Sequence, residues 1–344
     1  MTTMRAFVTG AGGFIGGRLV RWLRAHGWEV RGLVRPGRDP EPLRAIGAQP
    51  VVGTLGDLPV LRQACEGCEV VFHVAAALGP DAVPPTVFRV NVDGTENVLQ
   101  AACAAGARRL VFTSSVAVYG EAAPDGADED TPPHPSGPYG ESKLEAERLC
   151  LRYMREQGIE VVLLRPCFVY GPGDRYFLPT AVSILRGGWF PVVDGGALPL
   201  DVVHVDDVVQ AHLRAAAVPQ AAGRTYNVTD GRRRSVRELV ALAARAMGVR
   251  VRLIPIPRTL VRPAAYLLRA AAELVRAPGR ELITPENFGA MLAPHHFSIA
   301  RARRELGYEP TYQLEEVLPD LLNTFLFEGR REHEGARPAL GPRR

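Results

Sequence analysis

Two residues with a chemically suggestive spacing, Tyr139 and Lys143, stand four positions apart at the start of a helical pattern. Side chains at this spacing project from the same face of a helix. A tyrosine phenol titrates at about pH 10, too high for acid–base work near neutral pH, and a neighbouring ammonium stabilises the phenolate and lowers this pKa. The pair therefore predicts a proton donor for the interconversion of a secondary alcohol and a ketone.

Lys143 is the single lysine among the 41 basic residues of the chain, and all the others are arginine. A lysine ammonium is small and flexible, so it can hydrogen-bond a ribose hydroxyl while it lies beside a phenol, whereas an arginine guanidinium is a rigid planar fork. We therefore expect that the function of this position requires a lysine.

A glycine-rich segment, Thr9-Gly10-Ala11-Gly12-Gly13-Phe14-Ile15-Gly16, joins the first predicted strand to the first predicted helix. Its glycines permit a tight turn and a close approach to a pyrophosphate, whose charge is then met by the amides at the start of the helix. Because it lies between a strand and a helix, the pattern indicates a dinucleotide site. The predicted contacts are Gly10, Gly13, Phe14, Ile15 and Gly16.

The second predicted strand, 29–34, is followed by no acidic residue until Asp39. An acidic residue at the strand end would bind the ribose 2′-hydroxyl of NAD. Arg35, helped by Arg38, would instead bind a 2′-phosphate through charge-assisted hydrogen bonds. The sequence thus favours NADP(H) as the cofactor. The alternative is NAD(H), with Arg35 as an ordinary solvated side chain.

The elements that position these residues alternate between strands and helices. Apolar strand-like runs cover 5–9, 29–34, 50–52, 70–74, 110–113 and 160–165, and helical patterns cover 16–26, 91–105 and 139–157. Strands buried on both faces and joined by helices predict an α/β fold with a doubly wound parallel sheet, the Rossmann arrangement.

The pattern changes after Pro172, where short elements and many Pro and Gly residues predict a smaller C-terminal lobe. We expect a dinucleotide-binding Rossmann domain over 1–175, rejoined by 200–217. A substrate-binding lobe is expected over 176–199 and 218–328.

Two C-terminal segments have a distinct character. In 260–276, arginines recur every seven residues on one helical face, which predicts a helix packed on the protein. The alternative is a helix that lies at a membrane surface or lines the entry of an apolar ligand. The polar segment 329–344 has no apolar period and predicts a disordered tail.

Composition and cysteine usage narrow the functional classes. The net charge of +4 is spread along the chain, which argues against a nucleic-acid partner. Five cysteines, an odd and sparse set, argue against a disulfide framework and predict a cytoplasmic protein. Cys65 and Cys68 form an isolated CxxC, so no metal site is expected. No apolar run reaches membrane-spanning length, and the start of the chain leaves no room for a signal peptide.

Several motifs occur in one order along the chain. They are TGxxGxxG at 9–16, HVAA at 73–76, NVDGT at 91–95, TSSVAVYG at 113–120, YxxxK at 139–143, and RP followed by YGP within 165–172. With this combination, the chain resembles the extended short-chain dehydrogenase/reductase superfamily, which includes epimerases and dehydratases. The resemblance covers about residues 4 to 328.

The resemblance implies a catalytic set of Ser115, Tyr139 and Lys143, in which Ser115 orients the substrate oxygen. It also implies cofactor contacts from Thr54, Leu55, Ala75, Ala76, Ser114, Tyr139, Lys143, Pro166, Phe168 and Val169. Thr54 stands where the family usually has an aspartate that binds the adenine amine, which weakens that contact. A homodimer is implied through a four-helix bundle that includes 91–105 and 139–157.

Departures from the family's patterns narrow the substrate. Val116 and Ala117 replace the Asp-Glu pair of sugar 4,6-dehydratases, and Leu200 replaces an arginine that many nucleotide-sugar enzymes carry before the residue corresponding to Asp201. Segments 171–174 and 294–308, with the apolar stretch between 255 and 275, are similar to the 3β-hydroxysteroid dehydrogenase branch.

We therefore predict an NADP(H)-dependent oxidoreductase that interconverts a secondary alcohol and a ketone on a bulky, mainly apolar substrate, steroid-like or long-chain keto. The alternative is a nucleotide-sugar 4-epimerase with tightly bound NAD. A third hypothesis, a redox-sensing or scaffold protein that binds dinucleotide without catalysis, is disfavoured by the intact set of Ser115, Tyr139 and Lys143.

Overall fold

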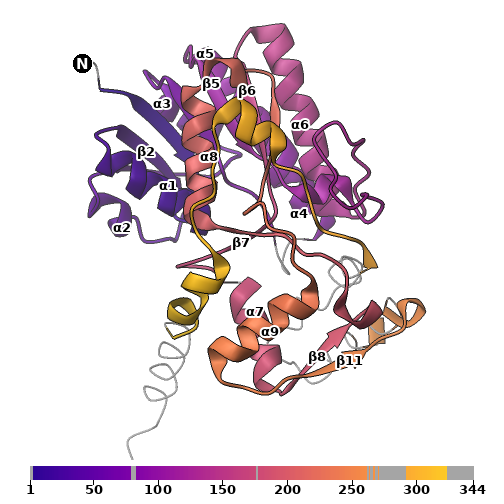
Figure 1. Cartoon of the computed structure of the whole chain (residues 1–344). Helices are drawn as coiled ribbons and strands as arrows, with labels where there is room; N and C mark the ends of the chain where they lie inside the picture. Colours follow the sequence, from indigo (N-terminus) through magenta and orange to yellow (C-terminus); the bar gives the residue numbers. More distant parts are fainter. Residues whose placement is uncertain are drawn as a thin grey trace, which may run out of the picture.

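The computed structural model describes residues 3–78, 83–175, 177–261 and 292–323, together with 263, 266, 267 and 270. The arrangement of these parts is shown in Figure 1. Most of the segment 260–276, for which membrane contact was considered, and the whole predicted tail 329–344 lie outside the described residues.

A parallel sheet of seven strands forms the centre of the described chain, in the order β10-β6-β5-β4-β1-β2-β3. Its strands are β1 (Arg5–Thr9), β2 (Glu29–Val34), β3 (Gln49–Val52), β4 (Val70–His73), β5 (Arg109–Thr113), β6 (Glu160–Pro166) and β10 (Thr225–Val228). Every residue of β4 and β5 is buried, because helices cover both faces of the sheet. The predicted doubly wound parallel sheet is confirmed.

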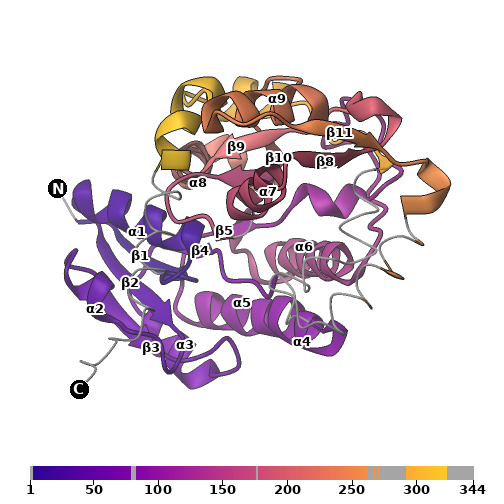
Figure 2. The same cartoon turned by 90° about the horizontal axis from the view of Figure 1, so that it is seen from below.

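Two layers of helices enclose the sheet (Figure 2). α1 (Phe14–Ala25) and α8 (Val205–Ala217) pack on one face through residues such as Leu19, Leu23 and Val208. α3 (Leu58–Cys65), α5 (Gly94–Ala104) and α6 (Pro138–Gln157) pack on the other through residues such as Leu61 and Leu99. The short helices α2 (Glu41–Arg44) and α4 (Pro84–Phe88) lie in connections, and a π-helical turn, η1 (Arg89–Asp93), leads into α5.

A smaller group of elements lies below the sheet in Figure 1. It contains α7 (Phe177–Arg186), α9 (Val236–Met247) and the paired strands β8 (Trp189–Val192) and β11 (Arg252–Pro255). Leu178 and Val182 of α7 share an apolar cluster with Leu318 and Leu322 from the C-terminal part. The start of α9 is fixed by a capping box between Ser235 and Glu238.

Two strands differ from the sequence prediction in their partners. β9 (Val202–His204), from the segment expected to rejoin the sheet, pairs instead with β7 (Phe168–Tyr170) in a separate two-stranded sheet, although α8 after it does pack on the main sheet. β10, from the range assigned to the lobe, is the seventh strand of the main sheet beside β6. The expected domain boundaries otherwise stay a prediction.

The reason that β10 was missed lies in its central residue. Asn227 is fully buried, and its side chain accepts a hydrogen bond from the Tyr119 hydroxyl at 2.8 Å and donates to the carbonyl of Ser298 at 3.3 Å. A polar residue interrupts the apolar run that marks a buried strand, and only distant partners make its burial possible.

Candidate active site

The strand order reverses between β1 and β4. In open parallel sheets, such a reversal places a ligand crevice at the carboxyl ends of the strands. Thr9, the last residue of β1, links the two strands there, because its hydroxyl accepts hydrogen bonds from the amides of Val74 and Ala75, both at 3.1 Å. Ala75 and the exposed Ala76 therefore lie at this edge, beside the glycine-rich turn.

The glycine-rich turn has the backbone shape that a pyrophosphate needs. Gly10 has a φ of +69°, and a Cβ there would lie 2.9 Å from the amide nitrogen of Ala75. A Cβ on Gly16 would overlap the carbonyl oxygen of Gly10. α1 begins after Gly13 with no side-chain cap and no acidic residue in its first turn, which includes the partly exposed Phe14 and Ile15. Its first amides can thus bind an anion, and the turn fits a dinucleotide pyrophosphate.

The residues expected near the adenosine differ in whether their polar groups are exposed to a ligand. Arg35 and Arg38 are both exposed on the turn after β2, where the amide of Arg38 donates to the carbonyl of Arg35 at 3.1 Å. The hydroxyl of Thr54 donates to Asp57 at 2.8 Å and accepts from the amide of Gly56 at 3.2 Å. Leu55 is buried. The exposed guanidiniums are therefore better suited than Thr54 to reach a ligand.

The predicted catalytic side chains lie together between the end of β5 and the start of α6. Ser115 precedes a short helical turn, η2 (Val116–Tyr119); its hydroxyl accepts from the amide of Ala117 at 3.1 Å and hydrogen-bonds the Tyr139 phenol. Lys143 Nζ lies 6.0 Å from the centroid of the Tyr139 ring and donates to the carbonyl of Thr113 at 2.7 Å. Ser115, Tyr139 and Lys143 form one cluster in the structure.

A glycine inside the YxxxK motif permits this cluster. α6 begins after the extended Gly137, with Pro138 in its first turn. A Cβ on Gly140 would lie 2.5 Å from the carbonyl oxygen of Ala117, so a larger residue would push α6 away from η2. Gly140 therefore lets Tyr139 approach Ser115, a role that the sequence analysis missed.

The pKa values correct one expectation. Burial raises the pKa of Tyr139 to about 12, and the hydrogen bond from Ser115 opposes this rise. Burial also lowers the pKa of Lys143 to about 8, against the attraction of Cys150 and Glu147. Lys143 was expected to lower the pKa of the phenol. In this structure the pKa of Tyr139 is raised instead, because burial of the phenol dominates.

A buried ion pair stabilises α6 one turn beyond Lys143. Arg165 of β6 donates to both carboxylate oxygens of Glu147, at 2.8 and 2.6 Å, and to the Tyr119 hydroxyl at 2.8 Å. The side chains of Arg165 and Glu147 are 6% and 4% exposed, so solvent screens this pair little. The contact fixes the helix that carries Tyr139 and Lys143 against the sheet.

A fully buried histidine connects the glycine-rich turn to α5. His73 Nδ1 lies 2.7 Å from the hydroxyl of Thr9, and Nε2 lies 2.9 Å from the hydroxyl of Thr95. Burial lowers the pKa of His73 to about 3, and the charge of Lys143 adds to this effect, so the ring is neutral. Since Thr95 donates to the carbonyl of Asn91 at 2.6 Å, it accepts from Nε2–H. His73 thus holds the strand ends in place.

Asn91 joins the loop after β4 to the first turn of α6. Its side chain accepts from the amide of Ala77 at 2.7 Å and donates to the Ser142 hydroxyl at 3.0 Å, which in turn donates to the carbonyl of Tyr139 at 2.8 Å. In the sequence, Asn91 stands out only as the first residue of the NVDGT motif and of the predicted helix 91–105. Its position in that motif was the available signal for this role.

The residues after β5 and β6 differ in polarity. The Ser114 hydroxyl is buried and has no hydrogen-bond partner among the described residues, so it can accept or donate one bond to a ligand. Pro166 is buried, whereas Phe168 and Val169 are partly exposed. The ring of Phe168 lies 5.4 Å from that of Phe177 and 5.9 Å from that of His295, between centroids. Phe168, Phe177 and His295 thus form a group of aromatic rings in contact beyond β6.

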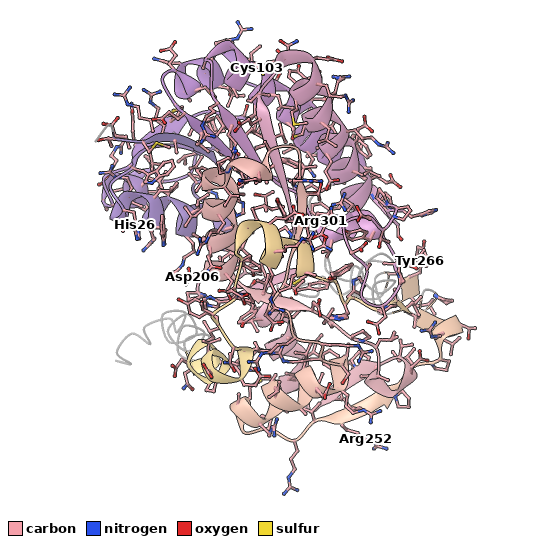
Figure 3. The ribbon with its side chains drawn as sticks, turned by 45° about the horizontal axis from the view of Figure 1, so that its top comes forward. His26, Cys103, Asp206, Arg252, Tyr266 and Arg301 are labelled. Carbon is pink, nitrogen blue, oxygen red and sulfur yellow. The ribbon has the colours of Figure 1, made fainter. Side chains whose placement is uncertain are left out.

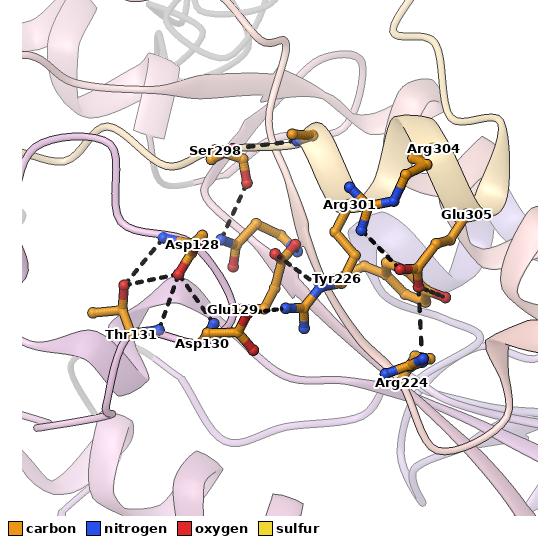
Figure 4. A network of polar contacts seen from close by, with 12 residues as sticks. Asp128, Glu129, Asp130, Thr131, Arg224, Tyr226, Ser298, Arg301, Arg304 and Glu305 are labelled. Carbon is orange, nitrogen blue, oxygen red and sulfur yellow. Dashed lines mark hydrogen bonds and ion pairs between the residues drawn. The ribbon is translucent and has the colours of Figure 1, made fainter.

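A polar network fixes the loop that precedes α6 (Figure 4). Glu129, with a side chain 1% exposed, accepts from the amide of Asn227 at 2.7 Å. Asp130 pairs with Arg301 at 2.6 Å, and Tyr226 donates to Glu305 at 3.1 Å. The loop 120–137, β10 and the segment 298–306 are therefore held together.

The two helices on the other face of the sheet are also joined at this end. Asp206, labelled in Figure 3, lies in the first turn of α8 and accepts a hydrogen bond from Arg18 Nε of α1 at 2.8 Å. Among the described residues, no group of His, Cys, Asp or Glu side chains could hold a metal ion, and the cysteines are free thiols. In the part of the chain described here, no helix is long and apolar enough to cross a membrane.

The fold and the site agree with a family match. The model of the NAD dependent epimerase/dehydratase family matches residues 6–229. The chain belongs to this family, and it is an NAD(P)-dependent enzyme of the extended short-chain dehydrogenase/reductase type.

Individual relatives include reductases and dehydrogenases. The chain is 35% identical over 321 residues to the 4-hydroxy-2-methyl-3-oxo-4-farnesyl-3,4-dihydroquinoline-1-oxide ketoreductase of Stigmatella aurantiaca, covering 89% of this chain and 92% of that one. It is 30% identical over 358 residues to a 3-beta-hydroxysteroid dehydrogenase of Mycolicibacterium neoaurum, covering 98% and 95%. Among solved structures, the UDP-glucose 4-epimerase of Thermotoga maritima is similar, with a TM-score of 0.76, 25% identity and coverage of 94% and 99%.

Proposed function

We propose that this enzyme is an NADP(H)-dependent oxidoreductase that interconverts a secondary alcohol and a ketone on a bulky, mainly apolar substrate. The observation that carries the proposal is the cluster of Ser115, Tyr139 and Lys143 at the same sheet edge as the glycine-rich turn. Such a cluster can exchange a proton with a substrate oxygen.

Each side chain has a distinct role in this proposal. Ser115, which bonds the Tyr139 phenol, orients the substrate oxygen beside it. Tyr139 gives its phenolic proton to that oxygen in reduction and takes it back in oxidation. Lys143, with its ammonium 6.0 Å from the centroid of the Tyr139 ring, can bind a ribose hydroxyl and so position the cofactor beside the phenol. When bound, the nicotinamide supplies or accepts the hydride.

The substrate class rests on the polarity of the surroundings. Phe168 and Phe177 present aromatic surface beyond β6, where a lipid-like substrate can bury apolar area. Leu200 offers no charge to a sugar diphosphate, and Val116 and Ala117 offer no acid and base for water elimination. A relative acts as a ketoreductase on a farnesylated quinoline, according to its name, which is consistent with such a substrate.

The preference for NADP(H) rests on Arg35 and Arg38. Both guanidiniums are exposed on the turn after β2, the position at which dinucleotide-binding folds contact the ribose 2′ group. A dianionic 2′-phosphate gains charge-assisted hydrogen bonds there that a hydroxyl does not.

The proposal is tested by measuring NADPH consumption with a panel of long-chain β-keto acids, steroid ketones and short polar ketones. We expect turnover with the long apolar members and weak activity with the polar ones. NADH in place of NADPH should raise KM for the cofactor. Absence of NADPH consumption across the panel, with the protein binding NADPH, would instead support a sensor or scaffold role.

A nucleotide-sugar 4-epimerase is the second candidate, because the similar Thermotoga maritima protein is named a UDP-glucose 4-epimerase and shares the fold. An epimerase would purify with bound NAD, convert a UDP-sugar and consume no added cofactor.

Three expectations from the sequence stay predictions. They are the homodimer through 91–105 and 139–157, the cytoplasmic location, and the contact of 260–276 with a membrane surface. The dimer can be tested by light scattering.

A further inference from the structure

Lys143 is connected to the opposite face of the sheet through a single residue, Thr113. The carbonyl of Thr113 accepts from Lys143 Nζ of α6 at 2.7 Å. The hydroxyl of the same residue lies 2.7 Å from Nε2 of His212, which belongs to α8. His212 and Lys143 are buried, with exposures of 0% and 1%.

The protons in this contact can be assigned. His212 Nδ1 lies 2.8 Å from the carbonyl of Val208, which has no proton to donate, so Nδ1 carries the hydrogen. Burial lowers the pKa of His212 to about 4, so the ring is neutral and Nε2 is an acceptor. The Thr113 hydroxyl therefore donates to Nε2, and its rotation is fixed.

The carbonyl of Thr113 is not held by the sheet on the β4 side. His73 lies opposite Phe112 in the parallel ladder, so the next donor to the Thr113 carbonyl would be the amide of Ala75. That amide donates to the hydroxyl of Thr9 instead, at 3.1 Å. The carbonyl is thus available to Lys143.

Among the described residues, two other contacts orient the peptide that carries this carbonyl. At one end, the amide of Ser114 donates to the carbonyl of Leu164 of β6 at 2.7 Å. At the other end, the Thr113 side chain is bound to His212. Without the second contact, the peptide and the Thr113 side chain have more freedom to turn away from Lys143.

We propose that His212 is a positioning residue for Lys143, acting through Thr113 to keep the ammonium aligned beside Tyr139. The inference rests on the proposed function for its effect on turnover, although not for its effect on Lys143 itself. His212 lies on the face of the sheet opposite α6, so replacing it leaves every side chain around the ammonium in place. The titratable groups that face Lys143 are Tyr139, Glu147 and Cys150 of α6 and His73 of β4.

The composition of the chain provides a direct measurement. Because Lys143 is the single lysine, protein labelled with lysine carrying carbon-13 at Cε gives one lysine signal, whose shift against pH reports the pKa of Lys143. This experiment requires no substrate and no activity, so it remains informative if the proposed reaction is wrong.

The variants are chosen to separate positioning from stability. His212→Leu removes the acceptor, His212→Gln restores an acceptor at a similar reach, and Thr113→Val removes the donor. Val209→Ala is the matched control, since Val209 is a buried core residue on the same helix whose apolar side chain cannot hydrogen-bond Thr113. Thermal unfolding of each variant records the loss of stability.

We expect His212→Leu and Thr113→Val to lower the pKa of Lys143, because the charged form loses a well-oriented acceptor, by roughly half a pH unit or more. The double variant should shift no further than either single one. His212→Gln should restore most of the original value, and Val209→Ala should leave it unchanged. In activity assays, kcat/KM should fall about tenfold in the two disrupting variants, and its alkaline limb should move to lower pH.

Two outcomes would overturn the inference. One is a pKa for Lys143 that stays at the wild-type value in both His212→Leu and Thr113→Val, with only thermal stability reduced. The other is an equal shift in Val209→Ala, which would show that any loosening of α8 has the same effect. If His212→Leu does not fold, Thr113→Val and His212→Gln decide between these results.

Discussion

Replacing the buried Lys143 with methionine should stabilise the fold while it removes activity. Lys143 is 1% exposed, and burial lowers its pKa from the usual 10.5 to about 8. At neutral pH it is charged in both the folded and the unfolded chain, but only the folded chain holds that charge away from water. Methionine has a similar length, carries no charge and fills the same space.

The size of the effect follows from the two pKa values. At 1.36 kcal/mol per pKa unit, the difference between 10.5 and about 8 corresponds to about 3 kcal/mol of destabilisation below pH 8. The variant loses the hydrogen bond to the carbonyl of Thr113, which costs it about 1 kcal/mol of stability. Lys143→Met should thus be more stable than the wild type by about 2 kcal/mol at pH 7.

The sign of the pH dependence is fixed by which state binds more protons. Between pH 8 and 10.5 the folded chain releases the proton of Lys143 before the unfolded chain does, so the wild type gains stability as pH rises through this window. Methionine does not titrate. The advantage of Lys143→Met should therefore be largest below pH 8 and should disappear toward pH 10.5.

The assay is urea unfolding of the wild type and Lys143→Met at pH 7 and pH 10. The difference in the free energy of unfolding between the two proteins is determined at each pH, so that the contributions of other titrating groups cancel. Lys143→Arg serves as a control. Because its side chain is larger and permanently charged, this variant should be less stable than the wild type at both pH 7 and pH 10. A variant Lys143→Met that is less stable at pH 7, or whose gain does not change with pH, would refute the reasoning.

Three further predictions concern catalysis and the cofactor. Tyr139→Phe removes the proton donor, so turnover should be lost while the dissociation constant for NADPH, measured by fluorescence titration, stays within about twofold; substantial residual turnover would contradict this. Gly16→Ala places a Cβ on the carbonyl of Gly10, so calorimetry should detect no NADPH binding, whereas Gly12→Ala, with open space around it, should still bind. Arg35→Ser should weaken NADPH binding about tenfold and leave NADH binding unchanged; equal losses for both cofactors would argue against a 2′-phosphate contact.

The parts of the fold that could be predicted from the sequence depend on local spacing. The segment Thr9-Gly10-Ala11-Gly12-Gly13-Phe14-Ile15-Gly16 fixes a strand, a turn and a helix in one short stretch, and Tyr139 and Lys143 share a helix turn. The parallel sheet follows from apolar runs that are long enough to be buried on both faces. Each of these signals acts over a few residues.

The parts that could not be predicted depend on contacts between distant residues. Asn227 is possible in β10 because Tyr119, 108 positions away, and the carbonyl of Ser298 satisfy its side chain. The link from Thr113 to His212 spans 99 positions, and no local pattern marks it. The pKa of Tyr139 depends on burial, which spacing does not reveal, and the expectation of a lowered value was therefore wrong.

The central claim, that Tyr139 and its neighbours support net hydride transfer to a ketone, is tested most directly by isotope transfer. The protein is incubated with a long-chain β-keto acid and NADPH carrying deuterium at the transferable position of the nicotinamide, and the product is analysed by mass spectrometry. We predict a hydroxy acid with one deuterium on the carbinol carbon for the wild type and none for Tyr139→Phe. Recovery of unlabelled substrate together with epimerisation of a UDP-sugar on NAD that co-purifies with the protein would contradict the claim.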